Sequence, residues 1–201
     1  MADYHTIALF DFDGTITYMD TFKSLLLYRF GIVSFCLGIL KNSKILAAYS
    51  GGFVSNHQAK ERLFGTFYGR TAYCDFQWDC RRYSLEHIDR IIRPEARSKL
   101  DWHRKEGHRV VIVSASIYDW IMPWALGNGV HEVIATEPEV VDGMLTGRFA
   151  TTNCYGPEKK KRFLEKYPER SSYTLYVYGD SRGDAELLAL ADVPFYRCFN
   201  V

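Results

Sequence analysis

The sequence predicts an α/β protein whose core is a doubly wound parallel sheet, with an all-α insertion after the first strand. Two observations support this class. From residue 94 onward, short apolar runs that end in polar or turn residues alternate with helical segments, which is the rhythm of strand–helix–strand units. A similar apolar run opens the chain at residues 7–10, and a largely helical stretch at 17–93 separates it from the others. We therefore expect one core domain formed by residues 1–16 and 94–201.

The composition is that of an ordinary globular protein. Of the 201 residues, 47% are hydrophobic and 24% are charged, and a chain of this length can bury a substantial core. A net charge of +1 gives no electrostatic footprint for nucleic acid, so we expect no nucleic-acid partner. Five cysteines without a C-x-x-C pair argue against a disulfide framework or a zinc site and fit a reducing compartment. The N-terminus lacks the basic start of a signal peptide, and the expected location is the cytoplasm.

The first strand ends in two carboxylates. The apolar run Ile7–Phe10 reads as a buried strand, and Asp11 and Asp13 follow it directly before Gly14. Residues i and i+2 of an extended segment face the same side, so both carboxylates point into one small space. A bound cation relieves the repulsion between such charges, and hard oxygen ligands suit magnesium. An aspartate that merely ends a strand or starts a turn is the alternative for this motif taken alone.

The insertion at 17–93 is predicted to be all helical. Its early part, Ser24–Leu40, is apolar with Arg29 as its only charge, and we expect it to form one or two buried helices. A surface that touches lipid or an apolar substrate is the alternative. The stretch Asn56–Ile92 reads as helical, with many aromatic residues that belong to a core.

The second half of the chain reads as repeated strand and helix units. The expected helices are 95–105, 117–126, 157–167 and 185–191, the strands are 109–113, 133–136, 173–178 and 194–199, and 140–145 is a hairpin with an Asp-Gly turn. Parallel strands place their carboxyl ends on one edge of the sheet. Four carboxylates and a hydroxyl are expected to meet there, with a lysine nearby: Asp11, Asp13, Asp180, Asp184 and Ser114.

These motifs resemble the haloacid dehalogenase superfamily of phosphohydrolases, in the branch similar to phosphoserine phosphatase. The D-x-D-G-T motif of that family corresponds to residues 11–15, and its strand ending in Ser or Thr to 110–114. Its helix lysine corresponds best to Lys159, and its G-D-x-x-x-D motif to residues 179–184. The resemblance implies a Rossmann-like core and a helical cap at 17–93.

The resemblance also implies roles for the residues. Asp11 is the expected nucleophile that carries an aspartyl-phosphate, and Asp13 the expected general acid and base. Ser114 and Lys159 are expected to hold the phosphoryl oxygens, with Lys160 and Lys161 as competitors for the lysine's role. Mg²⁺ is the expected cofactor, and its expected ligands are Asp11, Asp180, the backbone carbonyl of Asp13, and Asp184, which completes or orients the shell.

The substrate is expected to be a small phosphorylated metabolite or a lipid phosphate. The chain has Ser114-Ala115-Ser116 where phosphoserine phosphatases have Ser-Gly-Gly, and Asp20 where they have a glutamate that recognises the amino-acid head. Asp20 is therefore a candidate substrate-binding residue. Phosphoserine phosphatases and bacterial phosphatidylglycerophosphate phosphatases remain alternatives, and a receiver-like binding switch is the non-enzymatic one.

The apolar segment Ser24–Leu40 bears on that choice. If it walls the leaving-group pocket, an apolar or amphiphilic leaving group is favoured over a zwitterionic one, whose charges would lose water without gaining partners. The cap is then also expected to make a peripheral contact with membrane. The sequence indicates no defined protein partner.

Overall fold

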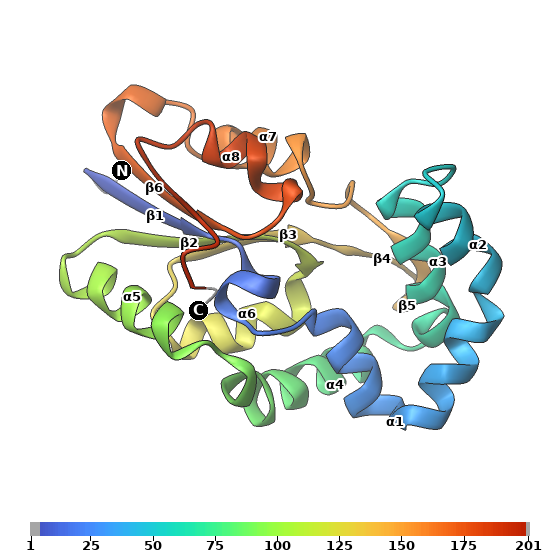
Figure 1. Ribbon diagram of the computed structural model, residues 1–201. Coiled ribbons are helices and arrows are strands. Elements are labelled where there is room, and N and C mark those ends of the chain that lie inside the picture. The colour runs from blue at the N-terminus through green and yellow to red at the C-terminus, as the bar shows by residue number, and fades with distance from the viewer. Residues whose placement is uncertain (1–4, 200–201) are drawn as a thin grey trace.

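A five-stranded parallel sheet forms the centre of the computed structural model, which describes residues 5–199 (Figure 1). The strand order is β3-β2-β1-β6-β7, and every neighbouring pair is parallel. The strands are β1 Thr6–Phe10, β2 Arg109–Ile117, β3 Glu132–Thr136, β6 Thr174–Gly179 and β7 Val193–Tyr196. From β1 the chain first adds β2 and β3 on one side and later β6 and β7 on the other. Sheets of this kind bind ligands at the carboxyl ends of the strands where the order reverses, which here is beside β1. The predicted fold class is confirmed.

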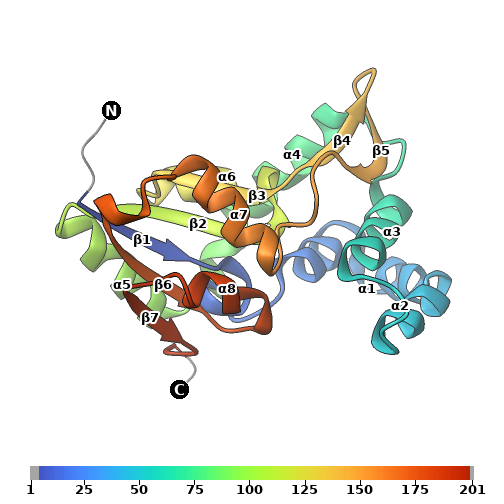
Figure 2. The ribbon, with the colours of Figure 1, turned by 90° about the horizontal axis from the view of Figure 1, so that it is seen from above.

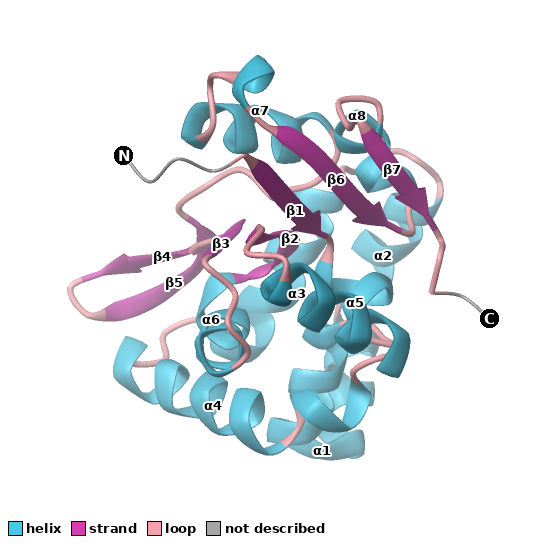
Figure 3. Ribbon diagram, turned by 90° about the vertical axis from the view of Figure 1, so that its left-hand side faces the viewer, coloured by secondary structure: helices cyan, strands magenta, loops and turns pink. Residues whose placement is uncertain are grey.

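Helices cover both faces of this sheet (Figure 3). The helices α5 Pro94–Lys105 and α6 Tyr118–Gly127 lie on one face, and α7 Pro157–Lys166 and α8 Ala185–Leu188 lie on the other. Alternate residues of each strand enter the two cores: Ala8 and Phe10 face α5 and α6, whereas Ile7 and Leu9 face α7 and α8. This burial on both faces is why the strands are apolar throughout.

The insertion forms a helical cap at one end of the sheet (Figure 2). Its helices are α1 Thr21–Lys41, α2 Ser43–Ser50, α3 Asn56–Tyr68 and α4 Tyr73–Glu86. Short helical turns occupy η1 Phe12–Ile16, η2 Ile88–Ile91, η3 Arg170–Ser172 and η4 Arg182–Asp184. The division into core and cap at 17 and 93 stays a proposal, because a core hairpin also joins the cap.

That hairpin is formed by β4 Pro138–Val141 and β5 Met144–Phe149, with the predicted turn at Asp142-Gly143. Both turn residues have positive φ, as this tight turn requires. The hairpin leaves the sheet and pairs with the loop between α3 and α4: the Arg70 amide donates to the Leu145 carbonyl at 2.8 Å. The helical stretch expected across 56–92 is therefore interrupted at residues 69–72, because backbone groups there bond to the hairpin instead.

The expectation that Ser24–Leu40 is buried is wrong for its second half. The helix α1 kinks at Gly31, where φ is +73°. Before the kink Leu25 and Leu26 are fully buried, but beyond it Val33 is 70% exposed and Leu40 is 69% exposed. By length and composition α1 could cross a membrane, and only 22% of its most apolar window is buried. An apolar sequence pattern shows which residues avoid water, but it does not show whether protein or another apolar phase covers them.

Two strands of the main sheet end three or more residues away from the expected position. The strand predicted at 109–113 continues to Ile117, because its pairing with β3 resumes after an irregularity between Ser114 and Ile117. The last strand is Val193–Tyr196, and it ends earlier than residue 199. Neither change moves the polar residues that follow the strands away from the shared edge.

The core contains a buried histidine whose titration is expected to affect stability. His103 of α5 is fully buried, with its Nε2 2.9 Å from the Tyr178 hydroxyl. Burial, then the charges of His108 and Lys99, lowers the pKa of His103 to about 3. An unfolded chain protonates this group near pH 6.5, so its contribution to stability is present above that pH and is lost as pH falls toward 3.

We expect wild-type protein to lose about 1–2 kcal/mol of unfolding free energy from this group between pH 7 and pH 5. The His103→Gln variant should lack that component, and urea unfolding at both pH values measures it. The control His5→Gln, at an exposed position, should keep the wild-type pH dependence. An unchanged pH dependence in His103→Gln would contradict the proposed role.

Candidate active site

The polar residues predicted at the ends of three strands do meet at one edge of the sheet. Asp11 follows β1, Ser114 lies in β2, and Asp180 follows β6. All three are close to a cavity of about 300 Å³ between core and cap, which Asp11 and Ser114 line. The Asp11 amide donates to the Tyr178 carbonyl at 2.9 Å, which continues the pairing of β1 with β6. This hydrogen bond fixes the backbone position from which the Asp11 side chain extends.

Gly14 allows the first motif to turn beside the last one. Its φ is +82°, a region that favours glycine. A Cβ at this position would lie 2.4 Å from Oδ2 of Asp180, which no side chain can accept. Thr15 then donates its hydroxyl to Oδ1 of Asp180 at 3.3 Å. Gly14 and Thr15 therefore allow the segment that carries Asp11 to pack closely against the loop that carries Asp180.

Lys159 is the lysine that reaches the carboxylates. Its Nζ lies 2.5 Å from Oδ1 of Asp11 and 2.7 Å from Oδ1 of Asp184, and the side chain is 2% exposed. Burial alone would lower the pKa of Lys159, but Asp11 and Asp184 outweigh it and raise that pKa, so the group is a cation. Lys161 points outward, with Nζ 3.9 Å from Glu158 and from Glu165. Lys160 is part-exposed on the same helix.

Asp184 is fixed by the loop that carries Asp180. Its Oδ2 accepts the Ser181 amide at 3.0 Å and the Ser181 hydroxyl at 2.9 Å. Burial tends to raise the pKa of Asp184, but Lys159 and these donors lower it overall. These hydrogen bonds hold the Asp184 carboxylate in place, and its other oxygen, Oδ1, binds Lys159.

Three carboxylates gather closely enough to hold a metal ion. Ligand atoms of Asp11, Asp180 and Asp184 all lie within 4.8 Å of one another. Lys159 offers only one positive charge against these three groups. Burial raises the pKa of Asp11 well above its usual range, and burial with the Asp184 charge raises that of Asp180. A divalent cation would supply the missing charge, and an all-oxygen donor set fits Mg²⁺.

The side chain of Asp13 lies outside that cluster and bonds to the start of the cap. Its Oδ1 accepts the backbone amide of Thr21 at 2.9 Å and the Thr21 hydroxyl at 2.6 Å, while Oδ2 accepts the Ser116 hydroxyl. Burial, then the Asp20 charge, raises the pKa of Asp13, which favours a protonated carboxyl.

Sequence reasoning did not assign Thr21 or Ser116 to the site. Trp120 extends the same network, because its indole donates to the Thr21 hydroxyl at 3.0 Å. The signal for Ser116 was its place in Ser114-Ala115-Ser116, where the related phosphatases have glycine. Thr21 gave no signal, since its proximity to Asp13 depends on how the cap begins.

Ser114 and Asp20 also lie at the cavity. The Ser114 hydroxyl is buried and accepts the Ser116 amide at 3.0 Å, which leaves its own proton for a ligand. Asp20 caps α1, because its Oδ1 accepts the Lys23 amide at 3.0 Å. Its side chain is 48% exposed.

The cap side of the cavity differs from the expected apolar wall. It is formed by the following residues of α1, α2 and α3 and by the residue before α1: Asp20, Phe22, Lys23, Leu46, Tyr49, Asn56, Ala59, Lys60 and Leu63. None of the described residues that line this cavity comes from Ser24–Leu40. The expectation that this segment walls the leaving-group pocket is wrong, because α1 runs away from the cavity after its first turn.

The chain matches known proteins along nearly its whole length. The sequence profile described as haloacid dehalogenase-like hydrolase matches residues 8–189. Protein CicA of Caulobacter vibrioides is 32% identical over 96% of this chain and 86% of its own length. A probable phosphatase of Mycobacterium tuberculosis is 30% identical over 91% of this chain, which spans 65% of that protein.

The fold is also found among solved structures. A phosphoserine phosphatase in its apo form superposes with a TM-score of 0.66 at 16% sequence identity, over 95% of this chain and 85% of that one. At this identity the similarity shows a shared fold, and the Rossmann-like core and the cap are part of it.

The two contacts of Lys159 predict a large effect on stability. Replacing Lys159 by Met leaves Asp11 and Asp184 buried without a counter-charge, and we expect a loss of about 3 kcal/mol or more of unfolding free energy at pH 7. Urea unfolding measures it. Lys161→Met removes an exposed charge from the same helix and should change stability by less than about 0.5 kcal/mol. Equal effects of the two variants would contradict the assignment.

Proposed function

The chain belongs to the haloacid dehalogenase-like hydrolase family and is a phosphatase, and from that premise we propose a magnesium-dependent phosphomonoester hydrolase that acts through an aspartyl-phosphate. The observation that carries the proposal is the placement of Asp11. Among residues 5–199 it is the one carboxylate that contacts Lys159, belongs to the acidic cluster and lines the cavity beside Ser114. A phosphoryl group in that cavity would meet a nucleophile, a cation and a hydroxyl donor together.

The proposed reaction has two steps. A carboxylate oxygen of Asp11 attacks phosphorus, the bond from phosphorus to the ester oxygen breaks, and that oxygen takes a proton from Asp13. Water then attacks the aspartyl-phosphate and gives its proton to Asp13, which releases inorganic phosphate and restores Asp11. Ser114 and Lys159 hold the phosphoryl oxygens in both steps. Asp13 lines the same cavity, and to reach the ester oxygen its carboxyl must exchange a hydrogen bond from Thr21 or Ser116 for one to that oxygen.

Asp11, Asp180 and the backbone carbonyl of Asp13 would hold the Mg²⁺, with Asp184 completing or orienting the shell. The ion supplies charge neutralisation for the phosphoryl oxygens when it is bound. Lys159 and this charge together keep Asp11 ionised against the effect of its burial.

Small phosphorylated metabolites are the first candidate substrates, because the cavity is small and lined by charged and polar groups as well as apolar ones. A receiver-like switch would take phosphate at the same aspartate without turning over an ester. Turnover therefore separates the two functions.

A lipid phosphate is the second candidate, and the outer face of the cap favours it. Four apolar residues of α1 beyond its kink are each more than 60% exposed: Ile32, Val33, Leu37 and Leu40. Lys41 and Lys44 follow them and are exposed. Apolar side chains beside cations are what an anionic membrane surface attracts. The protein would then be cytoplasmic and touch the membrane through its cap.

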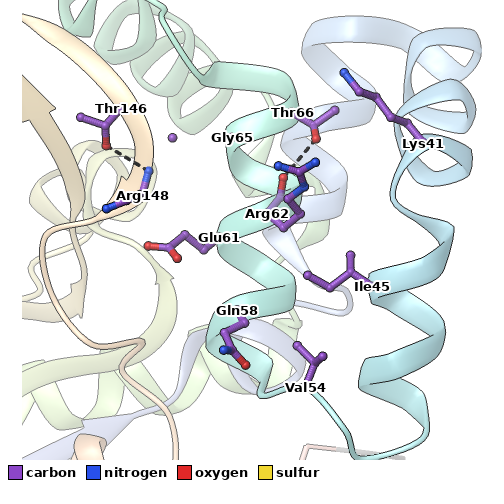
Figure 4. A pocket seen from close by; sticks show the side chains of 11 residues that line it. Lys41, Ile45, Val54, Gln58, Glu61, Arg62, Gly65, Thr66, Thr146 and Arg148 are labelled. Carbon is purple, nitrogen blue, oxygen red and sulfur yellow. Dashed lines mark hydrogen bonds between the residues drawn. The ribbon is translucent and has the colours of Figure 1, made fainter.

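A second cavity continues this basic surface (Figure 4). It has a volume of about 560 Å³ and lies among α1, α2, α3 and the hairpin strand β5. Lys41, Arg62 and Arg148 line it, together with the acidic Glu61 and the apolar Ile45 and Val54. Among residues 5–199, no ion pair involves these three cations, so they remain available to anionic headgroups.

The nucleophile gives the most direct test. Asp11→Asn should reduce the turnover of p-nitrophenyl phosphate by about 10³-fold or more, because the amide cannot attack phosphorus. Wild-type activity should require Mg²⁺ and disappear with a chelator. The control Asp192→Asn changes an aspartate remote from the cavity, and it should retain activity. Substantial turnover by Asp11→Asn, or by metal-free wild type, would overturn the proposed mechanism.

Membrane contact is tested with vesicles. Wild-type protein should sediment with phosphatidylglycerol vesicles and less with phosphatidylcholine vesicles, since the face carries cations. Val33→Glu with Leu37→Glu should abolish sedimentation without lowering p-nitrophenyl phosphate turnover, because both side chains are exposed and remote from the cavity. The control Glu106→Gln, at an exposed position of the core domain, should bind vesicles like wild type. If wild-type protein sediments with neither kind of vesicle, the proposed membrane contact is wrong.

A further inference from the structure

Lys60 is a cap lysine at the active-site cavity that the proposed reaction does not use. It projects from α3 into the cavity that Asp11, Asp13 and Ser114 line from the core side. Its Nζ donates to the carbonyl of Ala115 at 2.7 Å and lies 5.6 Å from the ring centroid of Phe22. This hydrogen bond holds a positive charge from the cap next to the residue that follows Ser114.

No carboxylate neutralises Lys60 at close range. Among the described residues 5–199, none of the ion pairs within 4.0 Å includes it, and the Ala115 carbonyl accepts its one hydrogen bond. An ammonium group has three donors, so two remain. Burial lowers the pKa of Lys60 overall, although the charges of Asp20 and Asp13 act in the opposite direction. A partly buried ammonium group that faces a cavity and has a carbonyl but no carboxylate within 4.0 Å is suited to an anionic ligand.

The scissile phosphoryl group already has its own partners on the core side. Lys159 contacts Asp11 directly, and Ser114 presents its hydroxyl there. Lys60 enters from the opposite, cap side, where the leaving group lies. The other cap residues near it include the polar Asn56, Tyr49 and Asp20. Together with Lys60 these residues give the cap wall polar partners for a leaving group, beside the apolar Phe22, Leu46, Ala59 and Leu63.

We propose that Lys60 binds a second anionic group of the substrate, so that the preferred substrates are phosphomonoesters whose leaving group carries a carboxylate or a phosphodiester close to the ester oxygen. The inference rests on the proposed phosphatase function and specifies its substrate class. Carboxylate and phosphodiester present the same anionic oxygens to an ammonium group, so the experiment contains an arm for each.

The test compares kcat/KM for matched esters in the Mg²⁺-loaded enzyme. Phosphoglycolate and phosphoserine carry a carboxylate, short-chain phosphatidylglycerophosphate carries a phosphodiester, and ethyl phosphate carries no second anion. Wild type should prefer at least one anion-bearing ester over ethyl phosphate by on the order of 10-fold or more, as a charge-assisted hydrogen bond provides. A preference for the carboxylate esters or for the phosphodiester identifies which source the site takes.

The substitution Lys60→Met should lower kcat/KM for the preferred ester by on the order of 10- to 100-fold, mainly through KM. The loss for ethyl phosphate and p-nitrophenyl phosphate should be much smaller, so the preference collapses. Lys60→Arg should restore part of it. Lys23→Met removes a charge from the exposed rim of the same cavity, where the side chain is 66% exposed, and should largely preserve the preference.

Three results would overturn the inference. The first is a wild-type enzyme that does not prefer any anion-bearing ester, which needs no variant to observe. The second is an equal loss for all esters in Lys60→Met, which would make Lys60 a ligand of the scissile phosphoryl group or a clasp between cap and core. The third is no loss at all. Failure of the phosphatase proposal is a distinct outcome, because wild type would then not hydrolyse p-nitrophenyl phosphate.

Discussion

The repulsion among carboxylates at one edge of the sheet is the constraint on which the rest of this structure depends. Asp11, Asp180 and Asp184 lie within 4.8 Å of one another in a site largely closed to water, and Lys159 supplies only one compensating charge. Such an arrangement persists because the backbone over-determines it. The Gly14 turn admits Asp180, and the Ser181 loop holds Asp184. The residual negative charge makes this edge a place for a divalent cation and, with it, for a phosphoryl group.

The cap contributes chemistry as well as cover. Thr21, the first residue of α1, holds the carboxyl of Asp13 together with Ser116 of the core. Lys60 of α3 donates to the carbonyl of Ala115, which lies between Ser114 and Ser116. Both contacts join cap and core beside the reacting groups. Movement of the cap would therefore change the positions of Asp13 and Lys60 together, which in the proposed mechanism would link closure to catalysis.

The two halves of helix α1 lie in different environments because the helix kinks at Gly31. Its first part packs into the shared core, and its second part presents apolar residues to the outside. The active-site cavity receives only its first turn, so the apolar character of the helix does not determine the leaving-group pocket. In the proposed function, substrate selection and membrane contact would therefore belong to different faces of the cap. A lipid phosphate with an anionic headgroup is compatible with both faces, whereas a soluble metabolite needs only the cavity.

The sequence by itself determined the sheet, the position of the helical insertion and the candidate residues at the strand ends. Apolar β-branched runs followed by polar turns are local signals, and parallel topology brings their ends together. Tertiary structure alone decided which lysine meets Asp11, because Lys159, Lys160 and Lys161 share one helix and differ in the direction each faces. It also decided that Thr21, Ser116 and Lys60 reach the site and that the second half of α1 stays uncovered. These outcomes depend on how cap and core pack, and no local pattern encodes that packing.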